Sequence, residues 1–176
     1  VERDSVYTGL VLEYADGGTL KDFIKGAPGG HLSSAQVKAL SLHIGEGLRA
    51  LHELGIVHRD VKAANILRVG GAWKLADFGI SKDTGRPQIN QTFAAHYTPG
   101  FAPPEQAGGA MPEAHASLDV YAFGKLMAFM LTGFTDPDHV RDTRWAVVIR
   151  GCTKQDPEGR LPLAEVLRRI RDEIAG

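Results

Sequence analysis

The sequence predicts an α+β fold that is mainly α-helical and carries one short β-hairpin. Over several long segments, apolar residues recur at three- and four-residue steps, as they do along the buried face of a helix. The adjacent glycines Gly70-Gly71 separate two strand-like runs, 66–69 and 72–76, which is the pattern of a tight hairpin turn. At 176 residues, the chain is long enough for one domain with a sizeable core.

The chain is expected to open with a strand and a short helix. Leu10-Val11-Leu12 has the composition of a buried strand, and Asp16-Gly17-Gly18 follows it as a turn. A short helix is predicted over 20–24, and the glycines and proline of 26–30 should end it. Because the sequence begins with Val1 and enters strand-like sequence directly, we expect a segment of the same domain to precede it.

A long amphipathic helix should follow. Ser33 and Gln36 have the spacing of a capping box, and the helix should run from there to about residue 54, where Gly55 suits a left-handed ending. Its predicted apolar face consists of Val37, Leu40, Ile44, Leu48 and Leu51.

Two further helices should complete the core after a long loop. Residues 79–105 have no convincing periodicity, and loops of that length in compact domains are usually functional. The segment 120–131 is apolar on nearly every side, which predicts a helix in the middle of the core. The last helix should start near Pro162, and its apolar face comprises Leu163, Val166, Leu167, Ile170 and Ile174.

Composition and charge disfavour several classes of protein. The 20 basic and 21 acidic residues give no broad positive surface for nucleic acid. The single cysteine, Cys152, has no partner for an internal disulfide, which predicts a reducing compartment, the cytoplasm. We expect no signal peptide and no membrane segment, because the longest apolar run is too short and contains Lys125.

The predicted hairpin brings two oxygen-bearing side chains together. With the glycine pair as its turn, the facing pairs are Val69–Ala72, Leu67–Lys74 and Asn65–Ala76. Asp77 then lies one residue past the partner of Asn65, so an amide oxygen and a carboxylate converge at the open end of the hairpin. Hard oxygen ligands in such a place suit Mg²⁺, which takes few protein ligands and completes its shell with phosphate and water.

The preceding loop adds an acid and a cation. Asp60 lies five residues before Asn65 and can overlook the same point, where a carboxylate would orient a hydroxyl and accept its proton. Lys62 should project to the same side of an extended loop. With Asn65 and Asp77 as metal ligands, this acid and this cation complete the parts that in-line phosphoryl transfer requires. Because polar groups flanked by apolar segments are costly to bury, we favour a functional role for Asp60, Asn65 and Asp77.

These segments resemble the catalytic and metal-binding loops of the protein kinase family. The matching segments, in the family's order, are His58–Asn65, Asp77–Gly79, Pro104-Glu105, Asp119–Gly124 and Arg160. The resemblance implies a kinase C-lobe in which 1–15 forms the end of an N-lobe strand and the hinge, 16–176 forms the C-lobe, and the rest of the N-lobe is missing. It implies ATP-dependent phosphorylation of protein serine or threonine, in a bacterial-type or tyrosine-kinase-like variant.

The resemblance also implies a role for each residue. Asp60 would be the catalytic base, Lys62 the cation typical of serine/threonine kinases, and Asn65 and Asp77 the ligands of two Mg²⁺ ions in a complete domain. ATP would contact the gatekeeper Leu12, the hinge residues Glu13 and Ala15, and Leu67 beneath the adenine. The structural and regulatory residues would be His58, Arg59, Phe78, Thr92, Thr98, Glu105, Asp119 and Arg160.

Several of these roles can be stated more closely. Thr98 would contact Asp60 and Lys62, Asp119 would hold the backbone of the catalytic loop, and Glu105 would pair with Arg160. A phosphate on Thr92 would order the long loop through Arg59. Simpler interpretations remain open, in which Asp119 only caps a helix, Arg160 is a solvated charge and Glu105 is a loop carboxylate.

Three features depart from the family's pattern. The chain has no glycine-rich phosphate loop, strand lysine or partner glutamate, so we expect the 176 residues alone to be inactive. The usual A-P-E motif is Pro103-Pro104-Glu105, preceded by Phe101 in place of a tyrosine. Only eleven residues separate Gly133 from Trp145, so the docking helix of the family is reduced to about one turn within 137–142, or substrate selection differs.

Two other functions remain open. A pseudokinase or scaffold would use the fold for binding, although the intact Asp60, Lys62, Asn65 and Asp77 argue against it. A small-molecule phosphotransferase of related fold also keeps the five-residue spacing from aspartate to asparagine, but Arg59, Lys62, Glu105 and Arg160 together favour protein substrates.

Overall fold

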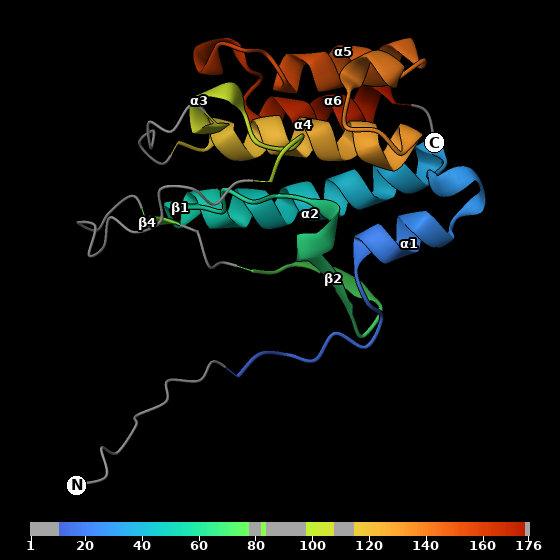
Figure 1. The fold of residues 1–176 in the computed structure, drawn as a ribbon. Helices are drawn as coiled ribbons and strands as arrows, with labels where there is room; N and C mark the ends of the chain where they lie inside the picture. The colour runs from blue at the N-terminus through green and yellow to red at the C-terminus, as the bar shows by residue number, and fades with distance from the viewer. Residues whose placement is uncertain (1–10, 78–81, 84–97, 108–114, 175–176) are drawn as a thin grey trace, which may run out of the picture.

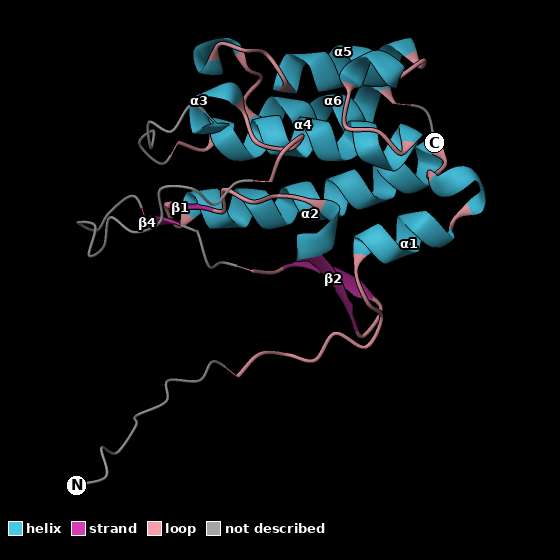
Figure 2. Ribbon diagram, viewed as in Figure 1, coloured by secondary structure: helices cyan, strands magenta, loops and turns pink. Residues whose placement is uncertain are grey.

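Most of the regular structure in the described part of the chain is helical, and the helices stack in layers with a small hairpin at one side (Figures 1 and 2). The computed structural model describes residues 11–77, 82–83, 98–107 and 115–174, and only the backbone of 82–83. The α-helices are α1 (Leu20–Gly26), α2 (Ser34–Glu53), α3 (Pro104–Ala107), α4 (Ser117–Thr132), α5 (Thr143–Cys152) and α6 (Leu163–Glu173). The predicted mainly helical α+β class is confirmed.

Short 3₁₀ turns and two-stranded ribbons connect these helices. The 3₁₀ turns are η1 (Pro28–Gly30), η2 (Ala63–Asn65), η3 (Pro137–His139) and η4 (Pro157–Gly159). The strands are β1 (Ile56–Val57), β2 (Ile66–Val69), β3 (Ala72–Leu75) and β4 (Lys82–Asp83). β1 pairs with β4, and β2 pairs with β3, both antiparallel.

The ends of α2 follow the predicted signals. The Gln36 N–H donates to Ser33 Oγ at 3.3 Å, and Gln36 Oε1 accepts from the Ser33 N–H at 3.0 Å, which completes the capping box. Gly55, with φ of 71°, follows the helix in the left-handed conformation. The predicted apolar face is buried at Val37, Leu40, Ile44 and Leu48, while Leu51 is half-buried.

The core lies around α4, which contacts both α2 and α5. Most of this helix is buried, including Phe123, Leu126, Met127 and Met130, as its apolar composition predicted. α6 covers α2 and α5 with its amphipathic face, and each of the five apolar residues predicted for that face is buried. Within the described ranges, no helix is long and apolar enough to cross a membrane.

The β2–β3 hairpin has the predicted register. Leu67 pairs with Lys74, and Val69 pairs with Ala72 across the glycine turn. One residue beyond the ladder, the Ala76 N–H donates to the Asn65 carbonyl at 2.8 Å. The hairpin therefore delivers Asn65 and the residue before Asp77 to the same end.

The predicted buried strand at Leu10-Val11-Leu12 is wrong for the residues that the structure describes. Val11 is 97% exposed and Leu12 is 72% exposed, and 11–15 form no strand, while Leu10 lies outside the described residues. An apolar run becomes a buried strand only when a neighbouring strand satisfies its backbone groups. In the described part of the chain, no strand pairs with 11–12.

Three elements, α5, β4 and α3, were missing from the sequence prediction. Helix α5 begins after Asp142, whose carboxylate caps the N–H groups of Arg144 and Trp145, and its buried face includes Trp145, Ile149 and Cys152. The spacing of these three apolar residues, three or four positions apart, could have predicted the helix from the sequence. Strand β4 and the first residues of α3 lie within the predicted long loop, 79–105. Residues 79–81 and 84–97 of that loop lie outside the described residues. The single turn expected near 137–142 is η3.

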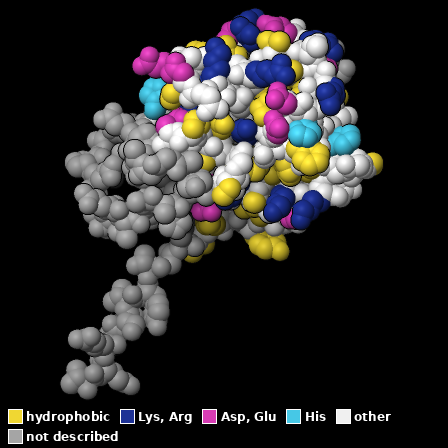
Figure 3. All heavy atoms as spheres, turned by 45° about the horizontal axis from the view of Figure 1, so that its top comes forward, with side chains coloured by type: hydrophobic (Ala, Val, Ile, Leu, Met, Phe, Trp, Pro, Cys, Tyr) yellow, Lys and Arg dark blue, Asp and Glu magenta, His cyan; other side chains and the backbone are white. Residues whose placement is uncertain are grey.

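Charge is distributed evenly on the surface that Figure 3 shows. Basic and acidic side chains alternate over its described part rather than gathering by sign. Ion pairs also form along α6, such as Arg168 with Glu165 at 2.8 Å. This pattern agrees with the balanced charge of the sequence.

Candidate active site

The loop between β1 and β2 is tied to the core helix by one buried carboxylate. Asp119, in the first turn of α4, is 0% exposed. Its Oδ2 accepts from the His58 N–H at 2.8 Å, and its Oδ1 accepts from the Arg59 N–H at 2.7 Å. Ala116 is the N-cap of α4, so Asp119 is not its capping residue. The loop's backbone is thereby fixed to the most buried helix.

Arg59 has an unusual backbone conformation where this anchor acts. Its φ is 70°, in the left-handed region that non-glycine residues rarely occupy. Such strain costs on the order of 1–3 kcal/mol and persists only where the surroundings hold it. Burial lowers the pKa of the Arg59 guanidinium, and the nearby Asp119 opposes that shift. The Arg59 carbonyl accepts from Gln106 Nε2 at 3.1 Å, a contact that no sequence pattern indicated.

Four polar side chains meet close to Arg59, namely those of Asp60, Lys62, Asn65 and Thr98. Asp60 Oδ2 accepts from Lys62 Nζ at 2.5 Å and from Asn65 Nδ2 at 2.8 Å. Asp60 Oδ1 accepts from the Thr98 hydroxyl at 2.7 Å, and the same hydroxyl accepts from Lys62 Nζ at 2.7 Å. Asp60 and Lys62 are mostly buried, with side chains 12% and 22% exposed. The site thus holds one alcohol between a carboxylate and an ammonium group.

His58 lies beneath this group and is completely buried. Its Nε2 lies 3.1 Å from the Ala76 carbonyl, and its Nδ1 accepts from the Asp60 N–H at 3.3 Å. The imidazole therefore connects the loop to the end of the hairpin.

The donor chemistry near the open end of the hairpin fits a magnesium ion. Asn65 is 7% exposed, and its amide nitrogen donates to the carbonyl and the carboxylate of Asp60 at 3.0 and 2.8 Å. The amide oxygen is the atom left to face a cation. Asp77 is exposed and has a φ of 64°. One amide oxygen and one carboxylate are the few hard ligands that Mg²⁺ takes from protein.

The end of the long loop is fixed by a buried ion pair. Arg160 Nη1 and Nη2 donate to the two oxygens of Glu105 at 2.7 and 2.9 Å. The Arg160 side chain is 1% exposed, and it also donates to the carbonyls of Ser117, Lys154 and Gln155. Its guanidinium lies 4.8 Å from the centre of the Tyr121 ring. Arg160 is therefore no solvated charge, and Glu105 is no free loop carboxylate.

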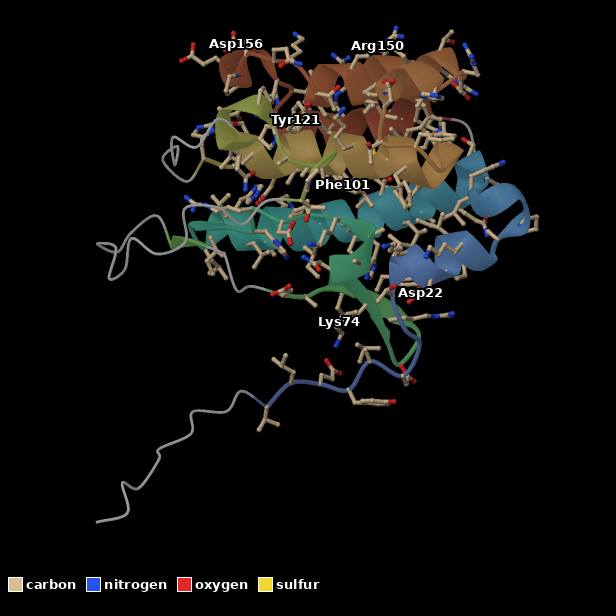
Figure 4. All side chains as sticks on the ribbon, viewed as in Figure 1. Asp22, Lys74, Phe101, Tyr121, Arg150 and Asp156 are labelled. Atoms are coloured by element: carbon tan, nitrogen blue, oxygen red, sulfur yellow. The ribbon has the colours of Figure 1, made fainter. Side chains whose placement is uncertain are left out.

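Aromatic packing holds the segment that carries Thr98. Phe101 contacts Phe129 of α4 edge-to-face, with ring centroids 6.0 Å apart. In Figure 4, Phe101 lies next to α4, the helix that carries Tyr121, while Lys74 lies on the hairpin. The turn at 98–101 is thus pressed onto the core helix next to Asp60.

The residues predicted to contact ATP are not enclosed by the described part of the chain. Leu12 is 72% exposed, Glu13 is exposed and pairs with Lys74 at 2.5 Å, and Ala15 and Leu67 are half-buried. The structure places Leu67 on β2, two residues after Asn65 along the chain. Phe78 and Thr92 lie outside the described residues.

The fold and the site define a protein kinase domain, and comparison with known proteins agrees. The chain belongs to the protein kinase family, because the family model described as "Protein kinase domain" matches residues 1–150. Its relatives include bacterial serine/threonine kinases, as the resemblance predicted.

Three relatives illustrate the similarity. PkaA of Streptomyces coelicolor is 32% identical over 195 aligned residues, which cover 95% of this chain and 35% of PkaA. PknB of Mycolicibacterium smegmatis is 35% identical over 84% of this chain and 23% of PknB. PknL of Mycobacterium tuberculosis is 37% identical over 76% of this chain and 33% of PknL. The chain thus spans between 23% and 35% of the length of these relatives.

Proposed function

We propose that this chain is the catalytic half of a serine/threonine protein kinase domain, with 1–15 as the end of the N-lobe and the hinge and 16–176 as the C-lobe. The reaction would move the γ-phosphoryl group of ATP to a serine or threonine hydroxyl of a protein. The observation that carries this proposal is the Thr98 hydroxyl, held between Asp60 Oδ1 and Lys62 Nζ at 2.7 Å each. A substrate alcohol needs the same two partners.

The chemistry of the loop follows from these contacts. Asp60 orients the acceptor hydroxyl and takes its proton as the oxygen attacks, a contribution of roughly 10²–10⁴ in rate. Lys62, held at 2.5 Å by Asp60, keeps positive charge beside the transferring group. Asn65 fixes the Asp60 carboxylate through its amide nitrogen at 2.8 Å. Each group therefore positions another, and none acts alone.

Asn65 and Asp77 would hold Mg²⁺, with two ions in the complete domain. A metal ion held by these two residues would supply positive charge against the charge that develops on the phosphate oxygens. The hinge backbone at Glu13 and Ala15 would bond the adenine edge, with Leu12 and Leu67 against its faces. The left-handed backbone of Asp77, φ 64°, supports this proposal, because strained residues concentrate at functional sites.

The remaining residues would support and regulate the site. His58 and Asp119 would fix the loop, and the Glu105–Arg160 pair would fix the end of the activation loop, to which Phe78 and Thr92 belong. Phosphate on Thr92 would order that loop through Arg59. Mass spectrometry of the active complete protein should then find phosphate on Thr92, and its absence there would remove this part of the proposal.

The test of the proposed function is Asp60→Asn in the complete protein, with its flanking sequence and any N-lobe that it contains. We expect kcat for a protein substrate to fall at least about a hundredfold, with native circular dichroism unchanged. Asp172→Asn, on the exposed side of α6, is the matched control and should leave kcat unchanged. Equal activity of Asp60→Asn and the wild type would contradict phosphoryl transfer at this site.

Two alternative functions make different predictions. A pseudokinase would bind ATP or partners without transfer, so the complete wild-type protein would release no phosphoryl group to any substrate. A small-molecule phosphotransferase would use a small alcohol or amine in preference to a protein. The buried Glu105–Arg160 pair, which shapes the loop beside Thr98, favours a protein substrate.

A further inference from the structure

A histidine side chain binds the backbone at the start of α4. The Nδ1 atom of His115 accepts from the Ser117 N–H at 3.3 Å and lies 2.9 Å from the Ser117 hydroxyl oxygen. The His115 carbonyl accepts the next N–H of the helix, that of Leu118, at 3.0 Å. Because the first N–H groups of an α-helix have no partner within the helix, His115 supplies acceptors for two of them.

The contact with the Ser117 N–H requires a neutral imidazole. A backbone N–H only donates, so Nδ1 of His115 must present its lone pair, and the hydrogen of the ring is on Nε2. A charged imidazole carries hydrogens on both nitrogens and offers no acceptor. The Ser117 hydroxyl suits either form, because it can donate to the neutral ring or accept from the charged one. The Ser117 N–H therefore loses its acceptor when His115 gains a proton.

Carboxylates on two neighbouring elements stabilise a charged ring. His115 borders a cavity of about 360 Å³, whose walls include Glu105 of α3 and both Asp156 and Glu158 beside η4. Figure 4 shows Asp156 near α3, at the end of the molecule where α4 begins. In the described part of the chain, Glu105 pairs with Arg160, whereas Asp156 and Glu158 are exposed and form no ion pair. The partial positive charge at the start of α4 disfavours a cation there, so a charged ring favours the cavity.

The first turn of α4 also carries contacts that hold the candidate site. Ser117 is buried, and its carbonyl accepts from Arg160 Nη1 at 3.0 Å. Two residues later, Asp119 accepts the N–H groups of His58 and Arg59 and so anchors the loop between β1 and β2. If the first turn of α4 opens, both contacts weaken.

We propose that His115 is a pH-sensitive cap of α4 that regulates the candidate active site. With a neutral ring, Nδ1 binds the Ser117 N–H, and the first turn of α4 stays closed. With a charged ring, His115 turns to Asp156 and Glu158, and the first turn opens more often. The proton acts on the site through Asp119, so His115 is a positioning residue and touches no reacting atom. Only the effect on catalysis rests on the proposed function.

The first test reads the ring directly in the wild-type chain. Long-range ¹H–¹⁵N NMR distinguishes an imidazole protonated on Nε2 from one protonated on Nδ1. At pH 8 we expect a neutral His115 with its hydrogen on Nε2, and the Ser117 amide signal should shift with the same midpoint as the ring during an acid titration. A neutral ring protonated on Nδ1, or an amide that does not follow the ring, would overturn the proposal.

The second test separates the cap from its titration. The side-chain oxygen of asparagine accepts a helix N–H without titrating, whereas phenylalanine keeps a ring and has no acceptor. We compare the amide exchange of Ser117 and Val120, each divided by its intrinsic rate at the same pH. From pH 8 to about pH 5.5, where imidazoles gain a proton, protection in the wild type should fall about tenfold. His115→Asn should keep its protection at both pH values, and His115→Phe should lack it at both.

Each outcome of the second test decides the proposal. Equal falls of protection in the wild type and His115→Asn would assign the pH dependence to other groups, and a wild type without pH dependence would exclude a switch. If His115→Asn lacks protection at both pH values, it serves as the uncapped form, and the wild type must reach its level only at low pH. If His115→Phe does not fold, the wild type and His115→Asn still decide. His31→Asn is the matched control and should follow the wild type, because His31 is also exposed but lies outside the cavity.

The effect on catalysis is read in the complete kinase. The ratio of kcat for His115→Asn to kcat for the wild type should rise as pH falls from 8 to 6, by at most about tenfold. This ratio cancels the pH dependence of steps that both proteins share, and a constant ratio would overturn the regulatory role. Exchange and NMR need no nucleotide or substrate. Failure of phosphoryl transfer therefore leaves the exchange result intact, and exchange without pH dependence leaves the proposed function intact.

Discussion

At the residue scale, two arginines show that burial decides how much an ion pair contributes to the stability of the fold. Arg160 and Arg168 each bind a glutamate through two hydrogen bonds. The Arg160 side chain is 1% exposed, whereas that of Arg168 is 49% exposed, where water competes for the same donors. Removal of one partner from a buried pair leaves a charge that nothing compensates.

Glu105→Gln should therefore destabilise the protein strongly. The Arg160 guanidinium would keep its carbonyl partners and one side-chain oxygen, but it would lose the negative charge that compensates its own, and we expect the free energy of unfolding to fall by about 3 kcal/mol. Urea denaturation at pH 7 measures the change. Arg168→Gln is the control, with a midpoint close to that of the wild type. Equal midpoints for Glu105→Gln and Arg168→Gln would show that the Glu105–Arg160 pair contributes little to stability.

Cys152 provides a second test at the residue scale. It is completely buried in α5, and burial raises the pKa of its thiol from the usual 9.0 to about 12. Above pH 9, the unfolded chain loses this proton and the folded protein keeps it, so stability should fall as pH rises from 9 to 12. The expected slope is about 1.4 kcal/mol per pH unit from this thiol. Cys152→Ala should show a shallower decline in urea titrations between pH 8 and 10.5.

Glycines set the helix separations at the scale of elements. A Cβ on Gly124 of α4 would lie 2.7 Å from the Cβ of Cys152 and 2.8 Å from Cγ2 of Thr153. A Cβ on Gly45 of α2 would lie 2.3 Å from Cδ2 of Leu167. The contact at Gly124 is the harder one, because the Cβ of Cys152 cannot rotate away as the end of a leucine can. The packing of α4 on α5 thus requires glycine there.

Gly124→Ala and Gly47→Ala should have opposite effects. We expect Gly124→Ala to lower the free energy of unfolding by about 1–3 kcal/mol through overpacking. The Cβ of Gly47→Ala meets Cδ1 of Leu75 at 3.4 Å, an ordinary contact. Because Gly47 lies inside α2, alanine there should raise stability by about 0.5–1 kcal/mol. Urea midpoints of the two variants measure both effects, and destabilisation by Gly47→Ala would refute this account of helix packing.

At the scale of the whole molecule, the proposed hinge segment is the least enclosed part of the candidate site. Val11, Leu12 and Tyr14 are 97%, 72% and 84% exposed. The segment contacts the hairpin through the Glu13–Lys74 pair and the hydrogen bond from the Gly17 N–H to the Arg68 carbonyl, 3.1 Å long. Small-molecule sites usually bury most of the ligand. An adenine against this hinge would have one covered side.

The 176-residue chain alone should therefore bind ATP weakly and transfer no phosphoryl group. Without further enclosure, we expect Mg²⁺–ATP to bind with a Kd of roughly millimolar or weaker, because small ligands need most of their surface buried. Isothermal titration calorimetry of the chain, compared with the complete protein, measures this difference. Phosphorylation of a generic protein substrate by the isolated chain would refute the expectation.

Local patterns predicted much of the fold because they act over a few residues. The capping box at Ser33 and Gln36, the glycine turn at Gly70-Gly71 and the apolar composition of α4 each specify an element without reference to the rest of the chain. For the same reason, the prediction of a buried strand at Leu10-Val11-Leu12 was wrong. Its pattern indicates a preference for burial, but a strand needs a partner that no local pattern supplies.

The sequence by itself determined the hairpin register, and with it the approach of Asn65 to the end that Asp77 follows, because both lie on one continuous ribbon. For contacts between distant segments, it offered only the resemblance to kinases, which implied that Thr98 meets Asp60. Tertiary packing alone decided that His52 reaches Asp119 and that Leu12 stays exposed. Turn and ladder geometry is fixed by neighbouring residues, whereas these contacts depend on how whole helices pack against one another.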